Sequence, residues 1–289
     1  MARNYGFPYK GSKNFIAKNI VDFLPAGGTL YDLFCGGCAI TDRAMESGKW
    51  ERFVINDLNP QLPLFFADAI QGKFRNRTEW ISREDFKRLS DSDPLVRYLW
   101  SFGNNGRDYL YSPENERIKG LAHRMLTDPD WRERWAWYLK FMRALKDNLG
   151  VLDKGENHVG DLENLERLQN LERLETLGGD YRNVPLNDPT GVVYCDIPYK
   201  GTNPYGKQAK GKFDYEAFYE WTERQELPVF ISEYGMPEDR FVSVWERHKI
   251  CSFGTNKSLM RVEHLYIPKS QVGLFERLKE RQNKELKLA

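Results

Sequence analysis

Four consecutive residues, Asp196-Ile197-Pro198-Tyr199, follow an apolar run at 192–195. Such a run fits a buried strand, and in open α/β sheets the ligand crevice lies at the carboxyl ends of the strands. There the Asp196 carboxylate and a backbone carbonyl can accept the N–H hydrogens of a planar heteroaromatic amine, while the Tyr199 ring stacks on its face. A plain strand-to-turn junction with a capping aspartate is the alternative, and four residues alone do not decide between the two.

A second apolar run, at 29–33, opens into the Gly36-Gly37 turn and then a helical pattern from about Ala39 to Gly48. Glycines let main-chain N–H groups approach a ligand at the start of a helix. The next expected strand, 52–58, contains Asp57 about 20 residues beyond the glycines, where a carboxylate can accept both hydroxyls of a ribose. A methyltransferase or a dinucleotide dehydrogenase would use such an acid. The dehydrogenase needs Gly-x-Gly-x-x-Gly, which residues 34–39 lack, and Asp57 as a plain turn aspartate remains the other alternative.

Near the N-terminus stands a third motif, Tyr9-x-Gly11-x-Lys13. In this order the three motifs resemble the D12 (Dam-like) class of S-adenosylmethionine-dependent DNA adenine methyltransferases, whose members carry Tyr-x-Gly-x-Lys, Asp-x-Phe-x-Gly, a target-recognition region and Asp-Pro-Pro-Tyr. Two departures stand out: Ile197 replaces the first proline of the tetrad, and Cys38 stands where the cofactor loop often has its second glycine. Isoleucine is tolerable because that position contributes a main-chain carbonyl. Cys38 bears on cofactor affinity.

The resemblance implies transfer of a methyl group from S-adenosylmethionine to the exocyclic amino nitrogen of adenine in double-stranded DNA, by base flipping and direct displacement. It also implies a possible restriction-modification setting and no metal. N4 methylation of cytosine, with Ser usual in place of Asp196, and a DNA-binding relative without turnover are the alternatives. The catalytic residues implied are Asp196, Ile197, Pro198 and Tyr199. The cofactor residues implied, with Lys13 facing the methionine carboxylate, are Tyr9, Lys13, Asp32, Phe34, Cys35, Gly36, Gly37, Asp57, Asp180 and Asp196.

The expected strands and helices predict an α/β fold. It is a Rossmann-like mixed sheet with helices on both faces. Residues 1–71 and 151–289 would form the catalytic domain. Over 72–150 the alternation of strand and helix stops, and the sequence becomes aromatic, arginine-rich and helical, which predicts a target-recognition insertion. A helix is expected over 130–149, with its apolar side chains at three- and four-residue spacing in the core; they are Trp131, Trp135, Tyr138, Met142, Leu145 and Leu149.

Two loops are candidates for contact with DNA. Residues 100–111 are rich in turn formers and in side chains that bond base edges, since Asn pairs with adenine and Arg with guanine in the major groove. Residues 200–212 contain lysines and glycines without an acid. A surface turn and a solvated linker are the respective alternatives. The DNA-binding residues predicted are Asn104, Asn105, Arg107, Tyr109, Lys200, Lys207 and Lys210.

The remaining pattern predicts a strand at 174–177, a helix capped by Asp214, and strands at 228–232, 242–251 and 261–268. Leucines recur every three residues over 162–177, which would not form one stripe on an α-helix.

The net charge is only +1 over 289 residues, so phosphate contacts must come from local clusters. The Cys35-x-x-Cys38 spacing permits zinc or redox chemistry, but no second pair completes a zinc site. With no apolar leader or spanning segment in sight, we expect a cytoplasmic protein, a monomer with a dimer as the alternative.

Overall fold

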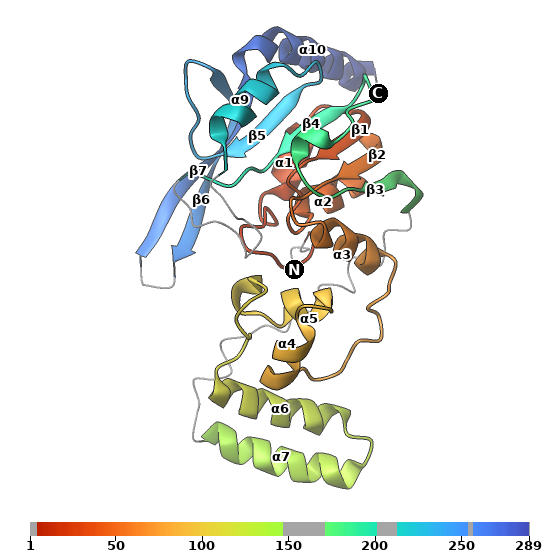
Figure 1. The fold of residues 1–289 in the computed structure, drawn as a ribbon, viewed down its shortest axis with the longest axis vertical. Helices are drawn as coiled ribbons and strands as arrows, with labels where there is room; N and C mark the ends of the chain where they lie inside the picture. The colour runs from red at the N-terminus through yellow and green to blue at the C-terminus, as the bar shows by residue number, and fades with distance from the viewer. Residues whose placement is uncertain (1–4, 147–170, 201–212, 254–256, 289) are drawn as a thin grey trace. The chain divides into compact units, whose positions relative to one another are not determined.

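The computed structural model describes residues 5–146, 171–200, 213–253 and 257–288 (Figure 1). The predicted contacts at Lys207 and Lys210, and most of the leucine repeat, lie outside the described residues. By their contacts the residues form two compact units, one of Met1–Phe7, Gly11–Gln71 and Leu165–Ala289, and a second of Pro8–Lys10 and Gly72–Asn164. Each unit is considered by itself below.

The first unit is built on a seven-stranded sheet with the order β3-β2-β1-β4-β5-β7-β6. The strands are β1 Gly27–Asp32, β2 Trp50–Ile55, β3 Leu174–Thr176, β4 Val192–Cys195, β5 Val229–Glu233, β6 Phe241–Phe253 and β7 Lys257–Pro268. Strands β3, β2, β1, β4 and β5 run parallel, whereas β7 is antiparallel to both β5 and β6. This arrangement confirms the predicted Rossmann-like mixed sheet. The strand order reverses between β1 and β4, and ligands bind such sheets at the carboxyl side of that switch point.

Helices cover both faces of this sheet, which is why every residue of β5, and all of β4, is buried without alternation between the faces. On one face, Phe218 packs with Val193 and Ile231 in a buried cluster. On the other face, Phe23 and Phe275, from two different helices, meet Phe230 of β5. The helices of this unit are α1 Ala17–Phe23, α2 Ala39–Ser47, α3 Gln61–Ile70, α9 Tyr215–Glu223 and α10 Val272–Leu288, with short 3-10 turns η2 Leu171–Arg173, η3 Tyr181–Asn183 and η4 Lys269–Gln271.

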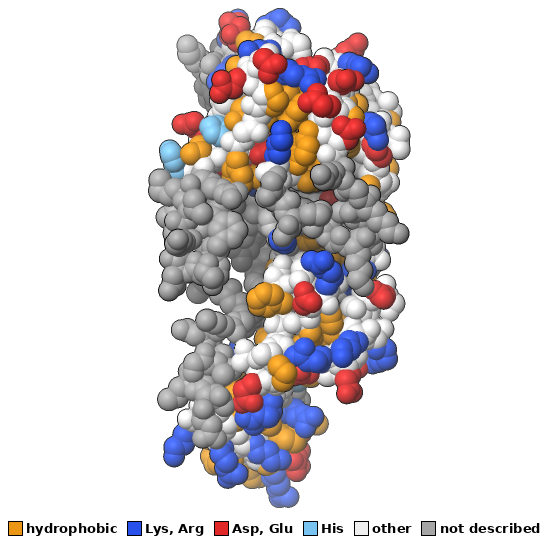
Figure 2. All heavy atoms as spheres, turned by 60° about the vertical axis from the view of Figure 1, so that its left-hand side comes forward, with side chains coloured by type: hydrophobic (Ala, Val, Ile, Leu, Met, Phe, Trp, Pro, Cys, Tyr) orange, Lys and Arg blue, Asp and Glu red, His pale blue; other side chains and the backbone are white. Residues whose placement is uncertain are grey.

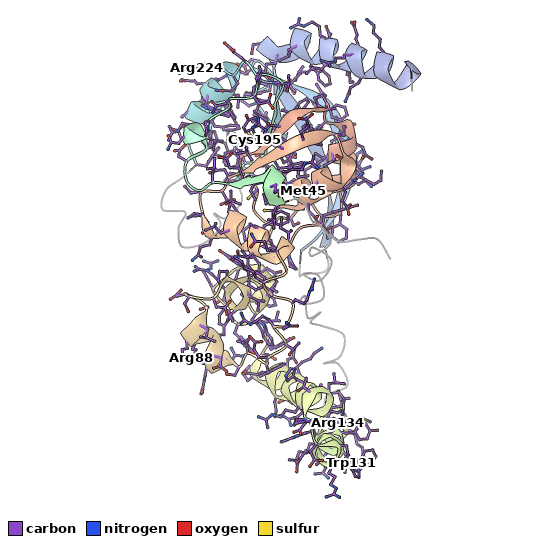
Figure 3. The ribbon with its side chains drawn as sticks, turned by 90° about the vertical axis from the view of Figure 1, so that its right-hand side faces the viewer. Met45, Arg88, Trp131, Arg134, Cys195 and Arg224 are labelled. Carbon is purple, nitrogen blue, oxygen red and sulfur yellow. The ribbon has the colours of Figure 1, made fainter. Side chains whose placement is uncertain are left out.

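Local sequence signals fix several of these boundaries. Asp214 accepts the backbone N–H of Ala217 at 3.0 Å and so caps α9, as predicted. The strand expected over 52–58 instead spans Trp50–Ile55, because the polar residues after Ile55 form the turn into α3. Figure 3 shows Cys195, the last residue of β4, within the body of the first unit. The residue that follows it, Asp196, therefore leaves the sheet at the switch point.

The second unit is helical, with α4 Arg83–Leu89, α5 Pro94–Leu99, η1 Phe102–Asn104, α6 Pro113–Thr127 and α7 Trp131–Lys146. Ser82 forms a capping box with Asp85, and Asp93 and Ser112 cap α5 and α6 directly before a proline. Its core is aromatic: the Trp80 ring stacks on Tyr111 at 5.9 Å between centroids, and Trp100 meets both edge-on.

The expectation that the aromatic stripe of α7 is core was wrong. Trp131 and Trp135 are 66% and 58% exposed, and Tyr138 and Met142 are exposed as well. A different side of α7 is covered, where Ala144 is buried and Trp137 donates its indole N–H to Asp128. Helical periodicity identifies a stripe but does not say which stripe meets a partner.

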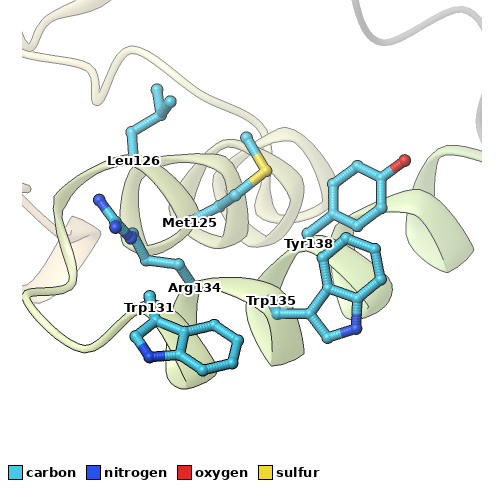
Figure 4. Close-up of a pocket in the computed structure, with 6 residues that line it drawn as sticks. All are labelled: Met125, Leu126, Trp131, Arg134, Trp135 and Tyr138. Carbon is cyan, nitrogen blue, oxygen red and sulfur yellow. The ribbon is translucent and has the colours of Figure 1, made fainter.

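The exposed stripe of α7 borders an open hollow of about 400 Å³ between α6 and α7 (Figure 4). Arg134 and Trp131 lie at the surface of α7 (Figure 3). Lys and Arg side chains gather over the pair of helices α6 and α7 in Figure 2. The hollow is lined by Met125, Leu126, Trp131, Arg134, Trp135 and Tyr138.

Among the described residues, none of the helices has the length and apolar character that a membrane span requires.

Candidate active site

The glycine turn after β1 is shaped by two left-handed residues. Gly36 has φ +48°, and Cys38, at the N-cap of α2, has φ +57°. The Cys38 N–H donates to the Cys35 carbonyl at 2.6 Å, which closes the turn. A left-handed φ is costly for a residue with a Cβ, so this position favours glycine and Cys38 carries local strain. Both thiols are buried, which raises their pKa values and makes them poor nucleophiles.

A segment that the sequence analysis missed braces this turn. The Phe7 N–H donates to the Gly37 carbonyl at 3.0 Å, and the Gly6 N–H donates to Asp42 of α2 at 2.7 Å. Gly6 has φ +67°, and a Cβ built there would lie 2.1 Å from the Gly37 oxygen. Glycine is therefore required at position 6. Its only signal in the sequence was a glycine close before the Tyr9 motif.

Asp32 ends β1 directly before the turn and is 1% exposed. One of its carboxylate oxygens, Oδ2, accepts the Thr41 hydroxyl at 2.8 Å, while the other, Oδ1, has no hydrogen-bond partner among the described residues. Burial raises the pKa of Asp32 to about 7 against the Thr41 bond, with help from the nearby charges of Asp196 and Asp57. A buried acceptor without a donor is costly and points to a ligand donor at this place.

Asp57 connects the end of β2 to the same turn. Its two oxygens accept the backbone N–H groups of Gly36 at 3.0 Å and of Asn59 at 2.9 Å. Burial raises the pKa of Asp57 to about 6, although these two bonds oppose the shift. The bond from Asn59 is the one expected of a plain turn aspartate. The bond from Gly36 places the carboxylate beside the glycine turn that follows β1. Each oxygen keeps a second lone pair for a ligand.

Asp196 is bound by a lysine from the N-terminal motif. The Lys13 ammonium donates to both Asp196 oxygens, at 2.6 and 2.7 Å. The Lys13 side chain is 5% exposed and that of Asp196 is 20% exposed, so this pair is poorly screened by solvent. Lys13 was predicted to face the cofactor carboxylate; here it joins the first motif to the last across most of the chain.

Tyr199 lies against the same ammonium. The Lys13 nitrogen is 4.6 Å from the centroid of the Tyr199 ring, and Tyr234 packs edge-on against that ring at 4.5 Å. The Tyr199 hydroxyl donates to Oε1 of Glu263 in β7. Burial, together with the charges of Asp196 and Glu263, raises the pKa of Tyr199 well above its usual range, so the phenol keeps its proton. Pro198 contributes its carbonyl to the Tyr215 hydroxyl at 2.9 Å, and Ile197 is buried.

The other predicted cofactor residues lie in different settings. Phe34 packs on Tyr181 with 5.2 Å between ring centroids. Asp180 caps η3 and forms an ion pair with exposed Arg182, which holds the pKa of Asp180 below its usual value. Tyr9 belongs to the second unit, where its ring meets Tyr98 edge-on at 6.2 Å.

The predicted recognition loop of the second unit divides by role. Asn104 donates to the Tyr98 carbonyl of α5 at 2.9 Å, and Asn105 donates to Asp108 of the loop at 2.8 Å. Tyr109 is buried and donates its hydroxyl to the Ile81 carbonyl at 2.7 Å. Arg107 is exposed. In the first unit, Lys200 is exposed and its backbone N–H donates to Glu233 at 2.7 Å.

The residues around the glycine turn fit a nucleoside cofactor. Three features lie at the switch point of the sheet: a buried Asp32 oxygen to which no described residue donates, an Asp57 carboxylate with remaining lone pairs, and a tight glycine turn. Together, the strand order and the antiparallel β7 are those of a Rossmann-like methyltransferase fold.

One family model matches part of the chain. Residues 9–132 match the family model of the D12 class N6 adenine-specific DNA methyltransferases. This is the class that the sequence motifs predicted, and the match supports adenine DNA methylation, whereas the cytosine alternative is not favoured. The matched residues include the first two motifs; the segment 195–199 lies beyond them.

No curated protein matches the chain in sequence. Among solved structures, one of a candidate methylase from Haemophilus influenzae is 10% identical, covers 90% of each chain and has a TM-score of 0.33. A likeness this weak carries no argument about fold or function.

Proposed function

We propose that this enzyme takes the methyl group from S-adenosylmethionine and transfers it to an adenine that has been flipped out of double-stranded DNA. The observation that carries the proposal is the convergence of Asp196 and Tyr199 on one buried point. A single N–H donor, the Lys13 ammonium, lies 2.6 Å from the carboxylate and 4.6 Å from the ring centroid. An adenine amino group needs the same two partners, an acceptor in its plane and an aromatic face.

The chain's own residues would act on the target amine. Asp196 accepts one N–H hydrogen and the Ile197 carbonyl accepts the other, which draws the nitrogen lone pair out of the ring. The Tyr199 ring stacks on the base. The bound cofactor supplies an electrophilic methyl group on a sulfonium. As positive charge develops on the adenine nitrogen, the carboxylate of Asp196 stabilises it in a site with little water.

For the cofactor, we propose that Asp32 and Asp57 bind from the ends of β1 and β2, with Phe34 and Tyr181 as an apolar wall. The simplest assembly is a monomer acting on cytoplasmic DNA, with a dimer as the alternative. Flipping is tested with 2-aminopurine in place of the target adenine, because its fluorescence rises when it leaves the stack. A rise on binding is expected, and fluorescence that stays unchanged even in a saturated complex of Tyr199→Ala, where no Tyr199 ring stacks on the base, would exclude extrusion.

Asp57→Ala should weaken S-adenosylmethionine binding by about ten- to a hundredfold, because charge-assisted hydrogen bonds contribute about 1.5–3 kcal/mol. Calorimetric titration measures this, with exposed Asp91 changed to Ala as the matched control. An unchanged dissociation constant would leave Asp57 with only its turn role.

The same titration has an expected pH dependence. Because the pKa of Asp57 is raised to about 6, the carboxyl holds its proton below that pH and is ionised above it. Wild-type affinity should therefore be lower at pH 5 than at pH 8, and this difference should shrink in Asp57→Ala.

Arg107→Ala should lower discrimination between target and non-target duplexes by about ten- to a hundredfold, since an Arg–guanine pair is worth about 1–3 kcal/mol. We choose Arg107 because both neighbouring asparagines already bond residues of the second unit. Lys200→Ala is the contrast: as a phosphate contact it would weaken binding to all duplexes and reduce the salt slope by about one. Binding curves at several salt concentrations separate the two effects, and a uniform loss in Arg107→Ala would make Arg107 a backbone contact.

A further inference from the structure

Glu263 is a buried carboxylate at the site to which neither the family motifs nor the proposed mechanism gives a role. Its side chain is 0% exposed. Oε1 accepts the Tyr199 hydroxyl and lies 3.7 Å from the Lys13 nitrogen. Oε2 is buried without a hydrogen-bond partner among the described residues. A carboxylate in this setting is unfavourable unless it serves a nearby cation.

Lys13 occupies the positions that the proposed mechanism gives to the adenine. It donates to both oxygens of Asp196 and lies near the Tyr199 ring. While the ammonium neutralises Asp196, that carboxylate cannot fully stabilise positive charge on the adenine nitrogen. The target amine and the lysine therefore compete for Asp196, and Lys13 needs a second counter-charge when the adenine binds.

We propose that Glu263 is this second counter-charge: a positioning residue that takes over the Lys13 ammonium when the target adenine bonds to Asp196. Its Oε1 is already within ion-pair distance, and Oε2 is open to a donor. Glu233, the other buried glutamate among the described residues, is less suited because its oxygens accept the backbone N–H groups of Lys200, Tyr234 and Gly235. The inference rests on the proposed function.

The test compares two duplexes that differ only at the target base, adenine or purine. Purine lacks the amino group, so it does not compete with Lys13 for Asp196. Glu263→Gln should reduce the adenine-over-purine preference in binding by about tenfold, the scale of one charged hydrogen bond, while affinity for the purine duplex and for S-adenosylmethionine stays within about twofold. Glu246→Gln on the exposed side of β6 makes the same chemical change and should leave the preference at the wild-type value.

A second comparison uses Lys13→Gln. Without the Lys13 ammonium there is no charge for Glu263 to take over. Adding Glu263→Gln to Lys13→Gln should therefore change the adenine-over-purine preference by less than about twofold, compared with about tenfold when Lys13 is present. If Glu263→Gln alone does not fold, a change of more than about twofold within this pair still overturns the inference. A wild-type preference in Glu263→Gln, or an equal loss with and without Lys13, would overturn the inference while leaving the proposed function intact. If the wild-type enzyme methylates no adenine, the proposed function falls, and this inference with it.

Discussion

Asp196→Ala is expected to reduce the rate of adenine methylation by at least about a hundredfold, because removing an electrostatic partner of the reacting group usually costs that much or more. Cofactor affinity should stay within about tenfold of wild type, because a purely electrostatic role at the target amine does not extend to cofactor binding. Single-turnover methyl transfer and calorimetric titration measure the two quantities on the same preparation.

The matched control is Asp214→Ala. It makes the same chemical change, loss of an aspartate carboxylate, at the cap of α9. That change should cost about 1 kcal/mol of stability and leave the rate near wild type. If Asp196→Ala kept more than about a tenth of the wild-type rate, well short of the expected loss, Asp196 would not be the acceptor for the target amine.

Gly6→Ala is expected to cost several kcal/mol of stability and most of the cofactor affinity. A Cβ at this position meets the Gly37 oxygen at 2.1 Å and the Ala39 nitrogen at 2.7 Å, all within backbone that cannot move without opening the glycine turn. The left-handed φ adds a further cost of about 1 kcal/mol. Thermal unfolding and cofactor titration measure the two effects.

Gly48→Ala separates the steric cost of an added Cβ from the cost of the left-handed φ. Gly48 ends α2 with φ +68°, almost the same as Gly6, but nothing lies within 4 Å of an added Cβ. It should lose only the conformational part, about 1 kcal/mol, with cofactor binding unchanged. Equal losses in the two variants would mean that the contact of Gly6 with the glycine turn is not important.

The sequence was informative where local chemistry decides the structure. The apolar run before Asp196 predicted β4, and Asp214 predicted the start of α9, because strand burial and helix capping are set by neighbouring residues. The order of motifs predicted the sheet and the class of enzyme.

Long-range pairing was not visible in the sequence. Lys13, Asp196 and Glu263 come from three distant segments, and nothing near Glu263 indicates that β7 buries it beside Tyr199. For the same reason, the stripe of Trp131 and Trp135 looked like core although the fold leaves it exposed. Helical spacing does not identify the face that a neighbour covers.

N6 methylation of adenine in duplex DNA is tested by identifying the modified nucleoside. The full-length protein is incubated with methyl-labelled S-adenosylmethionine and duplex DNA, and the DNA is digested to nucleosides for chromatography and mass spectrometry. We expect label in N6-methyldeoxyadenosine, and its loss in Asp196→Ala. Label in N4-methyldeoxycytidine, or no label in DNA from a protein that binds the cofactor, would contradict it.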